Sequence, residues 1–215
     1  MVDADSALLH APPMISAETP LVLGSASPRR RDILESLRIP FRVVPADVAE
    51  HVRAGEPPTE YLERVVRDKL TAVAARVPST GIAGVLVADT IVVLDEQILG
   101  KPADVNEAVH LLTRLVGRTH TVYTRYAISS GEQPAHILCA RTVQSQVTLR
   151  AASAAEVRRY AESGEGLDKA GAYAAQGLGA FLVQRIEGSY ANVVGLPACE
   201  LVEDLLRVGL LRDFP

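Results

Sequence analysis

The chain is poor in cysteine and lacks the residue spacings that hold structural metals. Cys139 and Cys199 are its only cysteines, and they form neither a Cys-x-x-Cys pair nor a disulfide framework. The five histidines show no zinc-ligand spacing. These absences argue against a disulfide-stabilised secreted domain and a zinc domain, and they favour a reducing compartment, which we expect to be the cytoplasm.

Neither a long hydrophobic run nor a broad basic region is present. No apolar run approaches the length of a membrane span. The first lysine or arginine is Arg29, so we expect that the basic start of a secretory signal is missing. The formal net charge is −4, and the one dense group of cations is Arg29 to Arg31. We therefore expect a soluble protein with no membrane or nucleic-acid partner, whose local basic charge serves a small ligand.

What the chain does contain is enough hydrophobic material for one large folded unit. Its 215 residues are 48% hydrophobic, which supports a single α/β domain over residues 20–215, preceded by a flexible extension over residues 1–19. Crossover helices and long hairpins predict a mixed, twisted α/β sheet with flanking helices rather than a doubly wound parallel sheet. The expected strands are 21–23, 41–44, 84–94, 97–101, 119–128 and 137–149, and the expected helices are 27–39, 59–77, 104–115, 153–162 and 199–206.

The most informative motif is LGSASPRRR at residues 23–31. Ser27 is expected to cap a helix that begins at Pro28, which sets the three arginines, Arg29 to Arg31, in its first turn. Each cation there is unfavourable by roughly 0.3–1 kcal/mol because the helix dipole is positive at that end. Free N–H groups beside arginines, in contrast, bind phosphate strongly. The motif therefore predicts a polyanionic ligand, with a solvated basic patch as the alternative.

Asp89 is the second strong signal. It is the only charged residue in the strand-forming segment 85–94, and a buried carboxylate is costly unless it is paired or binds a metal. If the chain reverses at residues 95–96, Lys101 lies across from residue 90 or 91 and shares a neighbourhood with Asp89. The alternative to a functional site here is a buried Asp89–Lys101 ion pair with no catalytic purpose.

Two further charged residues are ambiguous by pattern alone. Lys69 lies on the apolar face of its expected helix, four residues after Val65. Such a lysine commonly extends to solvent along the helix surface, but it could also point its ammonium group into a cleft. Glu50 follows the second expected strand and is, by composition alone, more typical of a surface acid.

The segment 166–181 combines four glycines and five alanines with two long polar side chains, Lys169 and Gln176. Small residues let the backbone approach a ligand closely, which leaves these two side chains to make directed contacts. The Gln176 amide carries one donor group and one acceptor, which matches the edge of uracil or thymine. The alternative is an ordinary glycine-rich loop.

Together these motifs resemble the Maf family of nucleoside triphosphate pyrophosphatases, from about residue 21 to residue 206. The resemblance implies a mixed α/β fold with two lobes around a deep cleft, similar to that of inosine triphosphatases. It also implies hydrolysis of a nucleoside triphosphate to the monophosphate and pyrophosphate with Mg²⁺ or Mn²⁺, and it is consistent with a homodimer. The five ordered blocks that carry it are LGSASPRRR at 23–31, VADT at 87–90, LGKP at 99–102, DKAGAYAAQG at 168–177 and GSYANVVGLP at 188–197.

The resemblance assigns catalytic roles to four residues. Asp89 would be the catalytic carboxylate, while Lys69 and Lys101 would line the phosphates. Glu50 would be its acidic partner, and Asp89 and Glu50 would hold the divalent metal. Ala49 is a departure, because the family often has an acid at that position.

The resemblance also assigns substrate binding. Ser27 and Arg30 would grip phosphate, whereas Arg29, Thr90 and Gln176 fall where the family sets base specificity. This combination resembles the subfamily that acts on dTTP and UTP, since the 7-methyl-GTP subfamily has a glutamate in place of Gln176. The full implied set is Ser27, Arg29, Arg30, Thr90, Lys169 and Gln176.

The predicted reaction is attack of water on the α-phosphate, with Asp89 orienting or deprotonating the water and no covalent intermediate. Substrates could include modified pyrimidine triphosphates such as 5-methyl-UTP and pseudo-UTP, which would suit a house-cleaning role in nucleotide pools. Two other classes stay open at this point. One is a nucleotide-binding regulator of septum formation and division arrest, whose hydrolysis is secondary. The other is a phosphatase for a sugar phosphate or similar small phosphoester.

Overall fold

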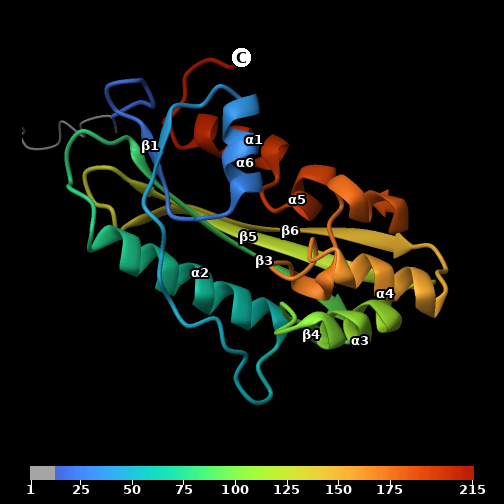
Figure 1. The fold of residues 1–215 in the computed structure, drawn as a ribbon. Helices are drawn as coiled ribbons and strands as arrows, with labels where there is room; N and C mark the ends of the chain where they lie inside the picture. The colour runs from blue at the N-terminus through green and yellow to red at the C-terminus, as the bar shows by residue number, and fades with distance from the viewer. Residues whose placement is uncertain (1–12) are drawn as a thin grey trace, which may run out of the picture.

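The computed structural model describes residues 13–215, which form a seven-stranded sheet with helices on both of its faces (Figure 1). The strands follow the spatial order β2-β1-β3-β5-β6-β7, and β4 pairs with β3 outside this path. The strands are β1 (Leu21–Leu23), β2 (Phe41–Val43), β3 (Gly84–Leu94), β4 (Gln97–Leu99), β5 (Thr119–Ser130), β6 (Ile137–Leu149) and β7 (Val183–Glu187). The helices are α1 (Pro28–Ser36), α2 (Pro58–Ala74), α3 (Val105–Leu115), α4 (Ala154–Glu162), α5 (Tyr190–Val194) and α6 (Ala198–Arg207), with 3₁₀ turns η1 (Ala170–Ala172) and η2 (Gly177–Leu182).

The sheet is mixed, as the sequence predicts. β1 is parallel to both β2 and β3, whereas β3, β5, β6 and β7 pair with one another in antiparallel fashion. In Figure 1, α2 covers one face of the sheet, and α1, α5 and α6 cover the opposite face. The long strands β3, β5 and β6 carry this sheet from one end of the molecule to the other.

Two buried hydrophobic clusters lie at different ends of the long strands. One joins Leu86 and Ala88 of β3 to Leu34 of α1 and to α6. The other joins Val92 and Leu94 of the same strand to α3 and α4. Because the same strand passes through both clusters, the fold has two lobes that share one sheet, in agreement with the expected architecture.

Most element boundaries agree with the sequence prediction, and the exceptions have local causes. β3 and β6 begin and end where predicted, and Ser153 caps α4 through a capping box with Glu156. α2 begins at Pro58 rather than after a Thr59 cap, since proline suits the first helical position. β7 and α5 are not predicted from the sequence, because both are short and lie in a segment rich in glycine.

The predicted extension over residues 1–19 falls mostly on residues 1–12, which lie outside the described part of the chain. In the described remainder, the Ile15 N–H donates to the Leu210 carbonyl, and the Ser16 hydroxyl accepts hydrogen bonds from the backbone of Glu18 and Thr19. Cys139 is buried and Cys199 is exposed, and both are free thiols. None of the helices between residues 13 and 215 has the length and apolar character that crossing a membrane would require.

Over the part of the chain that the structure describes, one edge of β3 has no strand partner in the middle of the strand, and the candidate site lies at this gap. β1 pairs with β3 along Gly84–Leu86, and β4 pairs with β3 along Val92–Leu94. β5 occupies the other edge of β3 from Gly84 to Val93, so β1 and β4 share the remaining edge. The stretch between them, residues 87–91, therefore has no strand partner on this edge, and Asp89 is at its centre.

Candidate active site

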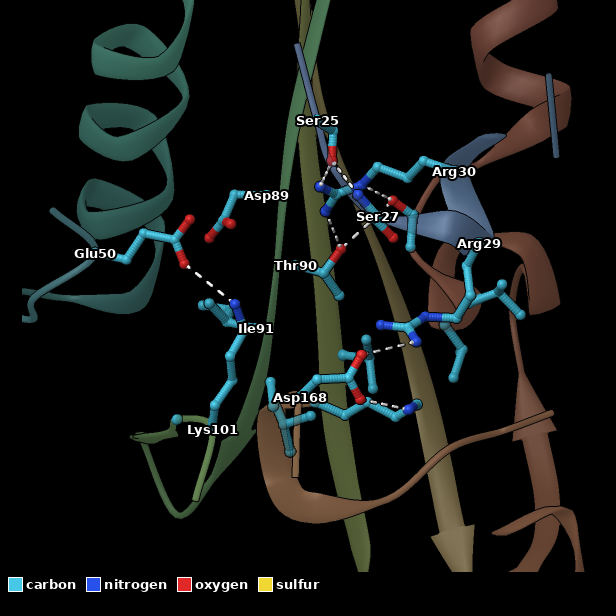
Figure 2. A pocket seen from close by; sticks show the side chains of 18 of the residues that line it. Ser25, Ser27, Arg29, Arg30, Glu50, Asp89, Thr90, Ile91, Lys101 and Asp168 are labelled. Atoms are coloured by element: carbon cyan, nitrogen blue, oxygen red, sulfur yellow. Dashed lines mark hydrogen bonds and ion pairs between the residues drawn. The ribbon is translucent and has the colours of Figure 1, made fainter. Parts of the chain in front are cut away.

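A cavity of about 630 Å³ lies at this gap, and it is lined by segments from both lobes. Its size is typical of a site for a small organic ligand. Because side chains alternate along a strand, Asp89 points toward α2 and Thr90 points toward α1 (Figure 2). All the predicted site residues line this cavity: Ser27, Arg29, Arg30, Glu50, Lys69, Asp89, Thr90, Lys101, Lys169 and Gln176.

The Lys69 ammonium group lies between two carboxylates. Its Nζ is 2.7 Å from Asp89 Oδ1 and 2.7 Å from Glu50 Oε1. Lys69 and Asp89 are each only 6% exposed, because the apolar face of α2 packs on β3 and carries Lys69 with it. The alternative that Lys69 extends to solvent along the helix is therefore wrong.

Lys101 lies near this cluster but does not pair with Asp89. Its Nζ is 3.6 Å from Glu50 Oε2, and its side chain is 59% exposed. The pairing of Val92 with Leu99 would bring Lys101 opposite Thr90 if it continued, but the ladder ends at Leu99. The alternative of a buried Asp89–Lys101 ion pair is wrong, since Lys69 is the partner of Asp89.

The charge state of Glu50 follows from these neighbours. Partial burial raises the pKa of Glu50, but Lys69, through charge and a direct hydrogen bond, outweighs this effect together with Lys101 and Arg30. The net result is a pKa below the ordinary value, so Glu50 is ionised near neutral pH. Tyr61 of α2 donates a hydrogen bond of 3.3 Å to the Glu50 carbonyl and so holds the backbone of this acid in place.

Arg30 enters the cavity from the opposite side, through the turn between β1 and α1. It is 8% exposed, and its guanidinium donates to the Gly195 carbonyl (2.8 Å), Ser25 Oγ (2.9 Å) and Thr90 Oγ1 (3.1 Å). Burial lowers the pKa of Arg30, and Asp89 and Glu50 offset part of this effect. Within residues 13–215, no carboxylate lies within ion-pair distance of Arg30, so its charge is available to an anionic ligand.

The turn before α1 brings the backbone unusually close to β3. A Cβ atom at Gly24 would lie 2.7 Å from Val87 Cγ1 and 2.8 Å from Val73 Cγ2, so only glycine fits here. Ser27 occupies the N-cap position as predicted, although its side chain makes no capping hydrogen bond. Its hydroxyl is therefore not committed to the helix, while Arg31 in the same turn is exposed.

Asp168 connects two predicted cations across the cleft (Figure 2). Its Oδ2 lies 3.6 Å from Arg29 Nη1, and its Oδ1 lies 2.6 Å from Lys169 Nζ. Burial raises the pKa of Asp168, but the bond to Lys169 and the charge of Arg29 outweigh it and leave the pKa below its usual range. Gln176, further along the same segment, is exposed at the cavity.

Several residues of the site were missed by reasoning from sequence. Asn192 is fully buried and donates to the Val122 carbonyl (3.1 Å) and to Ser145 Oγ (2.9 Å), which anchors α5 on the sheet. This anchor places the carbonyl of Gly195 beside Arg30. The motif GSYANVVGLP marked this region without assigning it a role. The other missed residues are Ser25, Thr124 and Asp168.

The carboxylates of the cluster limit which metal sites are feasible. Among residues 13–215, no group of three or more His, Cys, Asp or Glu side chains gathers as a metal cage. Asp89 and Glu50 supply two carboxylates, each with one oxygen bound to Lys69. Mg²⁺ is commonly held by one or two carboxylates together with substrate phosphates and water. This donor set therefore fits a divalent ion that binds together with a phosphorylated ligand.

Comparison with known proteins places these features in a family. The family described as Maf-like protein matches residues 20–208. A dTTP/UTP pyrophosphatase of Myxococcus xanthus is 50% identical over 92% of this chain and 96% of its own length. Enzymes of the same name from Geobacter sulfurreducens and Geobacter metallireducens are 45% and 46% identical, each over 89% of this chain and 97% of their own length. A crystal structure of a nucleoside-triphosphatase / dITP/XTP pyrophosphatase from Mycobacterium abscessus is 12% identical over 61% of this chain and 73% of that one and aligns with a TM-score of 0.34.

Proposed function

The chain belongs to the Maf family, and on that basis we propose that it hydrolyses dTTP and UTP to the monophosphate and pyrophosphate. One observation carries the proposal. A single cavity brings the Lys69–Asp89–Glu50 cluster together with Arg30, a buried cation without a carboxylate partner in the described residues. A ligand that contacts both Arg30 and the Lys69–Asp89–Glu50 cluster needs several negative charges for the cations. It also needs an electrophilic centre near a carboxylate. A regulator that binds nucleotide without turnover is not favoured, because it would not need the buried carboxylate.

We assign the chemistry at the α-phosphate to Asp89. Lys69 holds Asp89 Oδ1 at 2.7 Å, which leaves Oδ2 to accept a hydrogen bond from a water molecule and to take its proton. Lys69 also fixes Glu50, so the two acids keep a constant orientation. Attack of this water breaks the bond between the α-phosphorus and the bridging oxygen, and pyrophosphate leaves.

The cations of the cleft stabilise the charge that develops as pyrophosphate leaves. Arg30 is held in place by three hydrogen bonds to uncharged groups, so its charge is prepositioned. Lys69 and Lys101 lie on the other side, and Ser27 offers a hydroxyl at the start of α1. Prepositioned groups of this kind are typically worth a few kcal/mol in the transition state.

We propose that Asp89 and Glu50 hold Mg²⁺ or Mn²⁺ together with the phosphates of the substrate. A divalent ion there would neutralise charge on the phosphate oxygens. Glu50 Oε2 does not bind Lys69 and is available to the ion, and Asp89 would contribute the lone pair of Oδ2 that the attacking water does not use.

Base selection is assigned to Arg29, Thr90 and Gln176, with Lys169 reaching the phosphates from the second lobe. The Gln176 amide is exposed at the cavity and can pair with the N–H and carbonyl edge of uracil or thymine. The hydroxyl of Thr90 already accepts a bond from Arg30 and contacts Thr124. Thr90 therefore also helps to hold Arg30 in place. Modified pyrimidines with the same edge, such as 5-methyl-UTP and pseudo-UTP, are proposed as further substrates in a house-cleaning role.

Compartment and assembly stay predictions: a cytoplasmic protein and a homodimer. The two free thiols agree with a reducing compartment.

A screen of nucleoside triphosphates with Mg²⁺ and with Mn²⁺ tests the proposed function. We expect dTTP and UTP to be the preferred substrates and pyrophosphate to be the first product. Orthophosphate as the first product would instead support a phosphatase for small phosphoesters. A preference for a purine triphosphate would refute the role of Gln176.

A further inference from the structure

The backbone on both sides of Gln176 is tied to one pair of side chains, Tyr160 of α4 and Glu165 in the loop that follows it. On the C-terminal side of Gln176, the Leu178 N–H donates to Glu165 Oε1 at 2.8 Å, and the Gly179 N–H donates to Glu165 Oε2 at 2.7 Å. A single carboxylate thus fixes two consecutive peptide groups.

The N-terminal side of Gln176 is fixed by the partner of this carboxylate. The Ala174 N–H donates to Tyr160 Oη at 3.0 Å, and Tyr160 Oη donates to Glu165 Oε2 at 3.0 Å. The Tyr160 ring is buried and packs edge-on against Phe181 with ring centres 5.8 Å apart. The hydroxyl that links both flanks of Gln176 therefore has a rigid support.

At two positions of the segment, Gly177 and Gly179, a larger residue does not fit the observed backbone. Gly177 has a φ of +71°, and a Cβ atom there would lie 2.3 Å from Glu165 Oε1. A Cβ atom at Gly179 would lie 2.5 Å from Tyr160 Oη and 2.5 Å from the Ala174 carbonyl. The turn after Gln176 therefore packs directly against Tyr160 and Glu165. The N–H groups of Leu178 and Gly179 keep the pKa of Glu165 below its usual value, despite the opposing effect of burial.

We propose that Glu165 and Tyr160 are positioning residues that fix Gln176 for recognition of the base. Gln176 itself is exposed, so its side chain gains little order from packing. Whether the Gln176 side chain reaches a base depends on the position of the backbone of residues 174–179. Hydrogen bonds from peptide N–H groups to a carboxylate are charge-assisted and are among the strongest that can fix this backbone. This inference rests on the proposed base-recognition role of Gln176.

The variant Glu165→Gln tests the inference without a change of volume. An amide NH₂ cannot accept from a peptide N–H, so at least one bond to Leu178 or Gly179 is lost. We expect kcat/KM for UTP to fall about tenfold through KM, while inhibition by inorganic tripolyphosphate, which has no base, stays unchanged. Glu162→Gln is the matched control, because Glu162 lies on the exposed side of α4 with Arg158 as its partner.

A double mutant separates positioning from general structural damage. If Glu165 acts through Gln176, then Glu165→Gln should have less than a twofold effect on UTP in the Gln176→Ala background. Full additivity of the two variants, or an equal loss of tripolyphosphate binding in Glu165→Gln, would overturn the inference. Tyr160→Phe removes only the hydroxyl and repeats the test if Glu165→Gln does not fold.

The outcomes also distinguish the inference from the function on which it rests. If Gln176→Ala leaves kcat/KM for UTP unchanged, the role of Gln176 in base recognition fails, and the inference fails with it. If Gln176→Ala weakens UTP turnover while Glu165→Gln and Tyr160→Phe do not, only the positioning role is refuted.

Discussion

Protonation of His120 should destabilise the fold in mild acid. His120 lies on β5, is 2% exposed, and its Nε2 is 2.8 Å from the hydroxyl of Tyr173, a residue that lines the cleft. Its Nδ1 is buried without a hydrogen-bond partner in the described structure. Burial lowers the pKa of His120 from 6.5 to about 4, because the imidazolium form would lose its hydration.

The sign and size of the effect follow from this pKa. Between the ordinary pKa of histidine and the lower pKa in the folded protein, His120 is protonated in the unfolded chain but not in the folded one. The free energy of unfolding therefore falls as the pH falls through this range. One pKa unit corresponds to about 1.36 kcal/mol, so the difference between 6.5 and about 4 costs about 3 kcal/mol once the pH reaches 4. About 2 kcal/mol of this cost is already present at about pH 5.

Urea unfolding of the wild type and of His120→Gln at about pH 7 and about pH 5 measures this cost. The amide of glutamine can replace Nε2 in the hydrogen bond to Tyr173, but it does not titrate. We expect the loss of unfolding free energy between the two pH values to be about 2 kcal/mol smaller in His120→Gln than in the wild type. Carboxylates such as Glu50 titrate in both proteins, so their contribution cancels. Equal losses in the two proteins would refute the reasoning.

Three further changes test the interior of the site. Lys69→Met removes the cation between Asp89 and Glu50, and urea unfolding should show a loss of about 3 kcal/mol; unchanged stability would mean that the two acids do not depend on Lys69. Arg30→Lys keeps a charge, but its single nitrogen cannot reach the three acceptors that Arg30 contacts through Nε, Nη1 and Nη2, so steady-state kinetics should show a rise in KM for UTP of at least about tenfold; an unchanged KM would contradict the assigned phosphate contact. The buried Thr124 hydroxyl donates to the Asn192 carbonyl at 2.9 Å and lies 2.8 Å from Thr90 Oγ1. Thr124→Val leaves these groups without that partner and should cost about 2 kcal/mol in thermal unfolding, whereas Thr124→Ser should be nearly neutral. Equal melting of the wild type and both variants would argue against a stabilising role of these two bonds.

The sequence predicts the long elements of this fold better than the short ones. β3 and β6 have uninterrupted strand-forming runs with clear turns at their ends, so their bounds are predicted correctly. β7 and α5 have five residues each. Pairing with β6 stabilises β7, and the bonds of Asn192 to the sheet stabilise α5, more than intrinsic strand or helix propensity does. Such tertiary support leaves no periodic signal in the sequence.

The site shows the same division between local and long-range information. Periodicity places Lys69 on the apolar face of α2, but only the position of Asp89 on β3 decides where the ammonium points. The expected register of the hairpin correctly brings Lys101 close to residue 90 of β3. However, the pairing of β3 with β4 ends at Leu99, and Lys101 lies near Glu50 rather than Asp89. Asp168 carries no local signal, because its role depends on Arg29, which reaches it from the other lobe.

Hydrolysis of UTP in water enriched in heavy oxygen tests most directly whether water attacks the α-phosphate with the help of Asp89. For the wild type, we predict that the label enters UMP and that pyrophosphate stays unlabelled. Asp89→Asn, with its fold verified by circular dichroism, should turn over at least about a hundredfold more slowly. Label in the pyrophosphate, or near-wild-type turnover by Asp89→Asn, would contradict this mechanism.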